Sequence, residues 1–289
     1  MRHNLHLLVI DPQNDFCDLP VNYLPPDPLA GALIAPALPV PGAHADMLKV
    51  AELVNRGKHG LSGITATIDS HHRLDIAHPT FWTDGDNGGV HPFTPIAAAD
   101  VRAGRYLPRD PSALPRVLAY LDTLEAAGRY TLMVWPIHCA MGTWGHNVHA
   151  DVQAAFNCWE DTALGTVNRV VKGTNPWTEH YSAILAEVPD AHDETTQLNS
   201  RFIALLSAAD RVFISGEAGS HCVKATTEHL AAHLDQRQLP KLVLLTDCMS
   251  AVTGFDAQHQ AFIDGMVARG LQTAKAAEVL PELLANARR

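Results

Sequence analysis

Short apolar runs alternate with helical patterns along most of this 289-residue chain, and no other feature restricts its fold more strongly. The apolar runs predict buried strands at Leu5–Ile10, Ile64–Ile68, Thr131–Trp135, Val167–Val171, Val212–Ile214 and Leu242–Leu245. Apolar residues at helical spacing predict helices at 46–57, 113–127, 146–157, 197–209, 222–236 and 257–269. Because continuous apolar strands are typical of parallel sheets covered on both faces, we predict an α/β fold with three αβα layers and a central, mainly parallel sheet.

Two long segments interrupt this alternation. One is a proline-rich loop at about 18–37, and the other covers about 79–127, as a loop over 79–111 followed by a predicted helix. Long ordered loops in a compact domain serve as lids, binding loops or subunit contacts. We interpret residues 1–289 as a single domain with these two insertions, whose roles the sequence leaves open.

The composition excludes several classes of partner. A formal charge of −10 without a basic stripe argues against binding to nucleic acid or to anionic membranes. Five irregularly spaced cysteines do not resemble a disulfide framework, and we find no signal peptide and no apolar run of membrane length. We therefore expect a cytoplasmic protein that acts on a small molecule, and homo-oligomer formation stays open.

Cys222 lies where a predicted strand turns into a predicted helix. The strand-like run at 211–215 is followed by a small-residue turn, Gly216–Ser220, and the helical pattern starts at Cys222. Free N–H groups and the positive dipole end of a helix favour an anion, so we expect a lowered thiol pKa and stabilisation of an oxyanion beside the sulfur. A nucleophilic cysteine is one interpretation, and a small buried apolar residue is the other.

Two further charged side chains follow other predicted strands. Asp11 ends the first apolar run, and Lys172 comes directly after the run at Val167–Val171. Because sites in parallel sheets lie at the carboxyl ends of strands, we expect both side chains to meet Cys222. Asp11 would take the thiol proton, and Lys172 would stabilise the developing anion. Taken singly, Asp11 also fits a turn carboxylate and Lys172 a surface lysine.

A third group of polar residues has the composition of a metal site. Asp69 and His71 follow the second predicted strand as Asp-x-His, and His138 follows the run at Thr131–Trp135. One carboxylate and two imidazoles suit a divalent zinc, iron or manganese ion with open positions for water or substrate. Asp-x-His is a weak motif by itself, and the nearby His72 and His78 are rival ligands.

Five segments in order resemble the cysteine-hydrolase superfamily of nicotinamidases and isochorismatase-like enzymes. The segments are Val9–Phe16 (VIDPQNDF), Asp69–His71, Trp135–Thr143 (WPIHCAMGT), Lys172–Gly173 with Tyr181–Ala183, and Gly216–Val223 (GEAGSHCV). The resemblance implies a catalytic triad of Asp11, Lys172 and Cys222. It also implies a cis peptide between Glu217 and Ala218, and an oxyanion hole formed by the N–H groups of Ala218 and Cys222. Ser220 departs from the family, which often has aspartate there.

The metal motif distinguishes branches of this superfamily. Nicotinamidases carry the Asp-x-His and Trp-Pro-x-His pair that Asp69, His71 and His138 match, and isochorismatase-like members generally lack it. In nicotinamidases the metal holds the pyridine nitrogen, and aromatic residues at the positions of Phe16 and Trp135 enclose the ring. We add His221, the neighbour of Cys222, as a substrate contact.

We therefore interpret the protein as an amidohydrolase that deamidates nicotinamide to nicotinate and ammonia through a thioester on Cys222. One alternative is a related cysteine hydrolase that acts on another small amide, carbamoyl or ureido compound. Another is a metallohydrolase in which metal-bound water attacks the substrate and Cys222 is structural. A binding protein without catalytic activity is the least favoured interpretation, because all three triad residue types are present.

Overall fold

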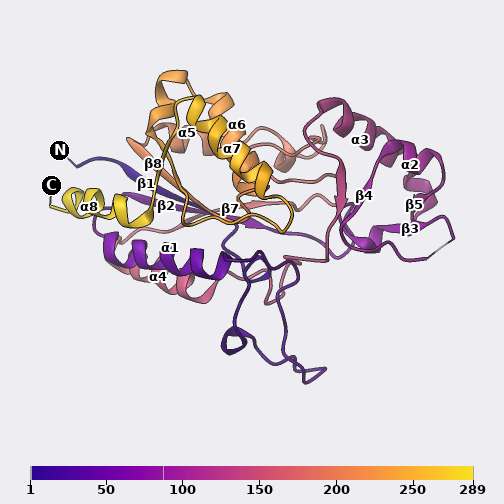
Figure 1. Ribbon diagram of the computed structural model, residues 1–289, viewed down its shortest axis with the longest axis horizontal. Coiled ribbons are helices and arrows are strands. Elements are labelled where there is room, and N and C mark those ends of the chain that lie inside the picture. The colour runs from indigo at the N-terminus through magenta and orange to yellow at the C-terminus, as the bar shows by residue number, and fades with distance from the viewer. Residues whose placement is uncertain (1, 87, 289) are drawn as a thin grey trace.

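The structure, a computed structural model, describes residues 2–86 and 88–288 and has a six-stranded sheet at its centre (Figure 1). In spatial order the strands are β10 (Gln272–Ala274), β9 (Leu242–Leu245), β8 (Arg211–Gly216), β1 (Leu5–Ile10), β2 (Gly63–Asp69) and β7 (Asn168–Lys172). All neighbouring pairs are parallel. The prediction of an α/β fold with a parallel central sheet is confirmed.

Helices cover both faces of this sheet. One face carries α1 (Ala43–Gly57), α4 (Ala150–Ala163) and α8 (Ala276–Asn286), and the other carries α5 (Ser200–Ser207), α6 (Cys222–His233) and α7 (Asp256–Ala268) (Figure 1). In α1, the side chains of Met47, Val50 and Val54 recur at helical spacing and are fully buried. That spacing gives α1 one apolar face, which packs towards the sheet.

The central strand β1 explains why a site forms at one edge of the sheet. All six of its residues are buried, because helices cover both of its faces. The chain continues from β1 to β2 on one side, whereas the other neighbour of β1 is β8. Strand order therefore reverses between β1 and β8, and open parallel sheets bind ligands at the carboxyl ends of the strands beside such a reversal.

The strand predicted at Thr131–Trp135 does not belong to the central sheet. Its middle forms β6 (Leu132–Val134), which pairs antiparallel with β4 (Thr94–Ile96). A short apolar run is compatible with any buried strand, and its periodicity does not identify its partner. The sixth central strand is instead β10, whose three residues are too few and too exposed to give a pattern. The helix predicted at 146–157 is α4, which begins at Ala150 and ends at Ala163.

The segment between β2 and β7 builds a second hydrophobic cluster. It contains β3 (Trp82–Asp84) paired with β5 (Tyr106–Pro108), the short helix α2 (Ala98–Arg102), and α3 (Leu114–Ala127). Trp82 and Leu121 are fully buried there, apart from the core around the central sheet. Figure 1 shows these elements beyond one end of the sheet. That residues 1–289 are one domain stays a prediction.

The helices of the described residues share one further property. Across 2–86 and 88–288, none combines the length and the apolar character that a membrane crossing requires.

Candidate active site

A tight turn leads from β8 into α6. Gly216 has φ 116°, and a Cβ atom there would lie 2.0 Å from the Ile10 carbonyl oxygen, so this turn requires glycine. The next peptide bond, between Glu217 and Ala218, is cis, as the resemblance implied. Within the described part of the chain, the N–H groups of Ala218 and Cys222 donate to no protein acceptor. Both are therefore available to a ligand at the start of α6.

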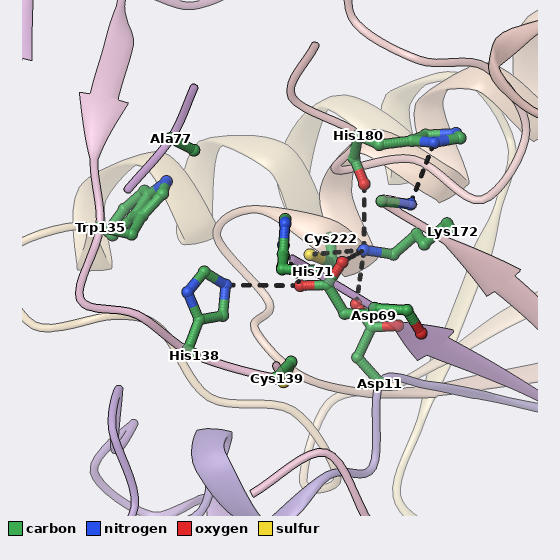
Figure 2. Close-up of polar contacts among 12 residues, drawn as sticks. Asp11, Asp69, His71, Ala77, Trp135, His138, Cys139, Lys172, His180 and Cys222 are labelled. Carbon is green, nitrogen blue, oxygen red and sulfur yellow. Dashed lines mark hydrogen bonds and ion pairs between the residues drawn. The ribbon is translucent and has the colours of Figure 1, made fainter. Parts of the chain in front are cut away.

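Lys172, the last residue of β7, contacts side chains at the ends of β1 and β2 and at the start of α6 (Figure 2). Its Nζ atom lies 3.0 Å from Asp11 Oδ2 and 3.6 Å from Cys222 Sγ. The same Nζ donates to Asp69 Oδ1 at 2.8 Å and to the His180 carbonyl oxygen at 3.0 Å. Asp11, Lys172 and Cys222 are all buried. The structure thus brings together the three residues that the sequence placed in one triad.

Local contacts hold Asp11 in place. Its φ of 44° is a left-handed conformation that aspartate tolerates better than most residues. Thr67 of the neighbouring β2 accepts from the Asp11 N–H at 3.0 Å and donates to Asp11 Oδ1 at 2.5 Å. Oδ1 is thus occupied by Thr67, and Oδ2 is the oxygen that faces Lys172.

The charges of this cluster set its protonation. Burial lowers the pKa of Lys172, but Asp11 and Asp69 outweigh burial and raise it well above its usual range. Burial raises the pKa of Asp69, but His71 and Lys172 outweigh burial and hold it well below its usual range. For Asp11 burial prevails over Lys172, so its pKa is raised. A charged lysine therefore lies beside one ionised carboxylate and one carboxyl that can hold a proton.

The expected lowering of the Cys222 pKa is wrong. Burial raises the thiol pKa well above its ordinary value, Lys172 opposes this, and Asp11 and Asp69 add to it. A hydrogen bond from the thiol to Asp11 also favours the protonated form. Asp11 is therefore a carboxyl group in contact with a thiol that keeps its proton.

Asp69, His71 and His138 form a buried group that could hold a metal ion. One ligand atom from each lies within 4.8 Å of the other two. Asp69 Oδ2 is 3.1 Å from His71 Nε2 and 3.4 Å from His138 Nε2, so one oxygen and two nitrogens converge (Figure 2). This donor set fits zinc, iron or manganese. Among the described residues neither rival histidine joins the group: His72 is exposed, and His78 turns its Nε2 towards His138 Nδ1 at 3.4 Å.

Further contacts orient the two histidines of this group. His71 Nδ1 lies 3.0 Å from Asp75 Oδ2, and Asp75 Oδ1 accepts from the Ala77 N–H at 2.9 Å. His138 Nδ1 lies 2.8 Å from the Pro136 carbonyl oxygen. Each histidine therefore uses Nδ1 for the protein and leaves Nε2 towards the centre of the group, as metal-binding histidines commonly do.

A pocket of about 370 Å³, its open mouth included, lies over the thiol. Phe16, Trp135 and His221, which the sequence analysis assigned to substrate binding, all line it. Trp135 Nε1 donates to the Tyr181 hydroxyl at 3.0 Å, which fixes the indole ring. The Trp135 and His221 rings meet edge to face at 5.2 Å.

Sequence analysis missed Glu179 and Leu38, which also line the pocket, and the supporting Asp75. Glu179 is buried, and its Oε2 atom has no hydrogen-bond partner among the described residues. Burial raises its pKa, and His71 opposes that rise. Glu179 and Leu38 belong to segments without regular pattern, so no periodicity could point to them. Tyr181 did stand in a recognised segment, but without an assigned role.

Solved structures share this architecture. A nicotinamidase and pyrazinamidase from Acinetobacter baumanii matches with a TM-score of 0.60 at 18% identity, over 96% of this chain and 98% of that chain. A pyrazinamidase of Pyrococcus horikoshii in complex with zinc matches with a TM-score of 0.52 at 20% identity, over 94% and 99%. An isochorismatase-like hydrolase from Alkaliphilus metalliredigens matches with 0.51 at 15% identity, over 96% and 98%.

The chain therefore has the isochorismatase-like hydrolase fold. At identities this low the likeness establishes the fold alone. No protein-family model matches the sequence, and no curated protein matches it either.

Proposed function

We propose that the protein is a cysteine amidohydrolase that converts nicotinamide to nicotinate and ammonia. The observation that carries this proposal is the position of Lys172, whose Nζ lies 3.0 Å from Asp11, 2.8 Å from Asp69 and 3.6 Å from Cys222. One ammonium thus links a base, a nucleophile and a candidate metal ligand at the floor of one pocket. This arrangement suits attack of a thiol on a carboxamide.

Acylation begins with the proton of the Cys222 thiol. Asp11 accepts it while the sulfur attacks the carboxamide carbon, and the carbonyl oxygen becomes an oxyanion. The N–H groups of Ala218 and Cys222 donate to that oxyanion, each contributing about 2.7–4 kcal/mol of transition-state stabilisation. The C–N bond then breaks as Asp11 returns its proton to the leaving nitrogen, and ammonia and a thioester remain.

Deacylation reverses these roles with water. Asp11, ionised after ammonia has left, takes a proton from a water molecule that attacks the thioester carbon. The C–S bond breaks, the proton returns to the Cys222 sulfur, and nicotinate is released. Lys172 remains charged throughout, because its raised pKa keeps its proton bound at neutral pH.

Asp69, His71 and His138 would hold a divalent zinc, iron or manganese ion at the side of the pocket. Such an ion supplies a Lewis-acid anchor for a pyridine nitrogen. Phe16 and Trp135 would enclose the ring, and the Trp135 hydrogen bond to Tyr181 would keep the indole in position. An aromatic amide with a ring nitrogen therefore fits this pocket better than an aliphatic amide.

The Glu179 carboxyl favours a second candidate substrate. Its Oε2 atom is buried beside the pocket without a partner among the described residues. A ureido or carbamoyl compound carries an additional N–H group that could donate to it. We therefore keep a carbamoyl amidase as the second candidate function.

Ammonia release from a panel of amides tests these proposals. Metal-loaded protein is assayed with nicotinamide, with benzamide, which lacks the ring nitrogen, and with N-carbamoylglycine. We expect release from nicotinamide and a kcat/KM for benzamide lower by about 100-fold or more, because the ring-nitrogen anchor is lost. Equal rates with benzamide would contradict the anchor. Release from the carbamoyl compound alone would replace nicotinamide with the second candidate.

A further inference from the structure

Glu217 is a buried acid that the proposed mechanism does not use. It is fully buried and directly precedes Ala218, whose N–H belongs to the proposed oxyanion hole. Its Oε2 atom accepts from the Ser250 N–H at 3.2 Å, and its Oε1 atom accepts no hydrogen bond from the residues that the structure describes. An ionised carboxylate with one unpaired buried oxygen is costly, so the group needs either a proton or a cation.

The neighbourhood supplies an acceptor for a proton on Glu217. Asp46 of α1 is buried, hydrogen bonds to Glu217, and accepts from Ser250 Oγ at 2.5 Å. Lys49 lies 3.6 Å from the other oxygen of Asp46, so the ammonium favours the negative charge on Asp46. Burial, followed by the charge of Asp46, raises the pKa of Glu217 well above its ordinary value. Burial raises the pKa of Asp46 as well, but the hydrogen bond from Ser250 and the Lys49 ammonium oppose that rise. These two contacts favour the negative charge on Asp46 and the proton on Glu217.

Charged and titratable groups approach this pair from each packed element. They are Asp46 and Lys49 from α1, Cys17 and Asp18 after the 3-10 helix Asn14–Phe16, Asp247 and Cys248 after β9, and His259 from α7. Lys49 is the one lysine among them, and its Nζ also donates to the Asp247 carbonyl oxygen at 2.7 Å. Lys49 thus pairs with Asp46 and with this carbonyl oxygen, which favours a proton on Glu217.

Hydrogen bonds on both sides of Ala218 connect this pair to the turn. The Glu217 N–H donates to the Ile10 carbonyl oxygen at 2.8 Å, and the Gly219 N–H donates to the Ser250 carbonyl oxygen at 2.7 Å. Ser250 therefore holds the turn twice, through the Glu217 carboxyl and through Gly219. The Ala218 N–H between these two anchors can shift only if they move.

We propose that Glu217 is a positioning residue: as a neutral acid it donates to Asp46 and, with Ser250, fixes the turn that presents the Ala218 N–H. The inference rests on the proposed amidase function for its catalytic consequence, but the neutral state of Glu217 does not depend on that function. Glu217 touches no substrate and acts through the backbone of the next residue.

Two variants separate hydrogen bonding from packing. Glu217→Gln keeps a donor for Asp46 and an acceptor for the Ser250 N–H, so we expect kcat within about threefold of the wild type. Glu217→Met fills similar space without either bond, so kcat should fall about 10- to 100-fold with KM little changed, below the effect of losing an oxyanion donor outright. Asn286→Ala removes a buried polar side chain far from the pocket and serves as the control with unchanged kcat.

Infrared spectroscopy tests the neutral acid without any assay of activity. In protein labelled with 13C-glutamate at neutral pH, the wild-type spectrum should contain a C=O band of a protonated carboxyl that is lost in Glu217→Gln, whereas any band of Glu179 or Glu187, whose pKa values burial also raises, remains. Absence of the Glu217 band from the wild type, or a kcat for Glu217→Met equal to that of Asn286→Ala, would overturn the proposal. If the wild type hydrolyses no amide, the proposed function fails, and the band still decides whether Glu217 is the neutral donor.

Discussion

Lys172 lies between two carboxylates that would otherwise be buried together. Its Nζ atom lies 3.0 Å from Asp11 and 2.8 Å from Asp69, and all three side chains are buried. Two carboxylates in a low-dielectric site repel each other, and one ammonium cancels most of that repulsion. The same ammonium lies 3.6 Å from the Cys222 sulfur, so a single residue serves both the stability and the proposed chemistry of the site.

Replacing Lys172 by methionine should therefore affect stability as well as activity. Lys172→Met leaves two buried carboxylates without a counter-charge, and we expect a loss of about 3–5 kcal/mol in the free energy of unfolding of the metal-free protein. Urea unfolding measures this loss. Lys241→Met is the matched control, because Lys241 donates to the Ser207 and Ala209 carbonyl oxygens and forms no ion pair with the described residues. Equal losses in the two variants would contradict this view of Lys172.

Asp75 has a separate role beside the candidate metal group. It lies 3.0 Å from His71 Nδ1 and holds that imidazole with Nε2 towards Asp69. Asp75→Asn should lower the affinity for a divalent metal about 10- to 100-fold while the fold is retained. Competition with a chelator measures the affinity. Asp27→Asn, at a half-buried aspartate of the proline-rich loop, is the control that should leave affinity unchanged. A loss of the same size there would refute the role of Asp75.

At the scale of elements, strand ends were easier to predict than strand partners. Asp11, Asp69 and Lys172 each follow a continuous apolar run, so sequence alone placed them at one edge of a parallel sheet. β6 was assigned to the wrong sheet, because an apolar run carries no information about its partner. Glu179 went unrecognised for a related reason: its position depends on tertiary packing of an irregular loop.

The turn between β8 and α6 gives a prediction about pH. A raised pKa means that folded Glu217 keeps a proton that the unfolded chain releases above the ordinary value of 4.5. The free energy of unfolding contributed by this residue therefore falls as pH rises from about 4.5 towards the raised pKa, by at most about 1.4 kcal/mol per pH unit. Glutamine does not titrate. The stability of Glu217→Gln relative to the wild type should therefore rise as the pH increases from about 5 to about 8, a range that lies above the ordinary glutamate pKa.

Urea unfolding at several pH values measures this difference. Glu52→Gln, at an exposed helix glutamate paired with Arg56, is the control and should follow the wild type. A constant difference between Glu217→Gln and the wild type across this pH window would mean that Glu217 is ionised in the folded protein.

At the scale of the whole molecule, the candidate metal group joins two hydrophobic clusters. Asp69 ends β2 of the central sheet and His71 follows it, whereas His138 follows β6, which packs in the second cluster. The backbone links the same places: the His71 N–H donates to the Cys139 carbonyl oxygen, and the Met141 N–H donates to the His71 carbonyl oxygen, both at 3.0 Å. A metal ion held there would bind only the folded chain, because unfolding separates its ligands.

Metal binding should therefore raise the stability of the entire fold. At a free metal concentration of 100 times Kd, the expected gain in the free energy of unfolding is about 2.7 kcal/mol. Thermal unfolding with zinc, iron or manganese and then with excess chelator measures it. Asp69→Asn should abolish the shift, and a metal-induced rise in Tm that survives in Asp69→Asn would place the bound ion elsewhere.

The central claim is that the Cys222 sulfur attacks the substrate. The most direct test is ammonia release from nicotinamide by wild type and Cys222→Ala at equal metal content, with Cys158→Ala as the matched control, since Cys158 lies on α4 and does not line the pocket. The account predicts rapid release by the wild type and by Cys158→Ala, and a fall of about 10³-fold or more in Cys222→Ala. Substantial release by folded, metal-loaded Cys222→Ala would contradict it and favour a metallohydrolase in which metal-bound water attacks.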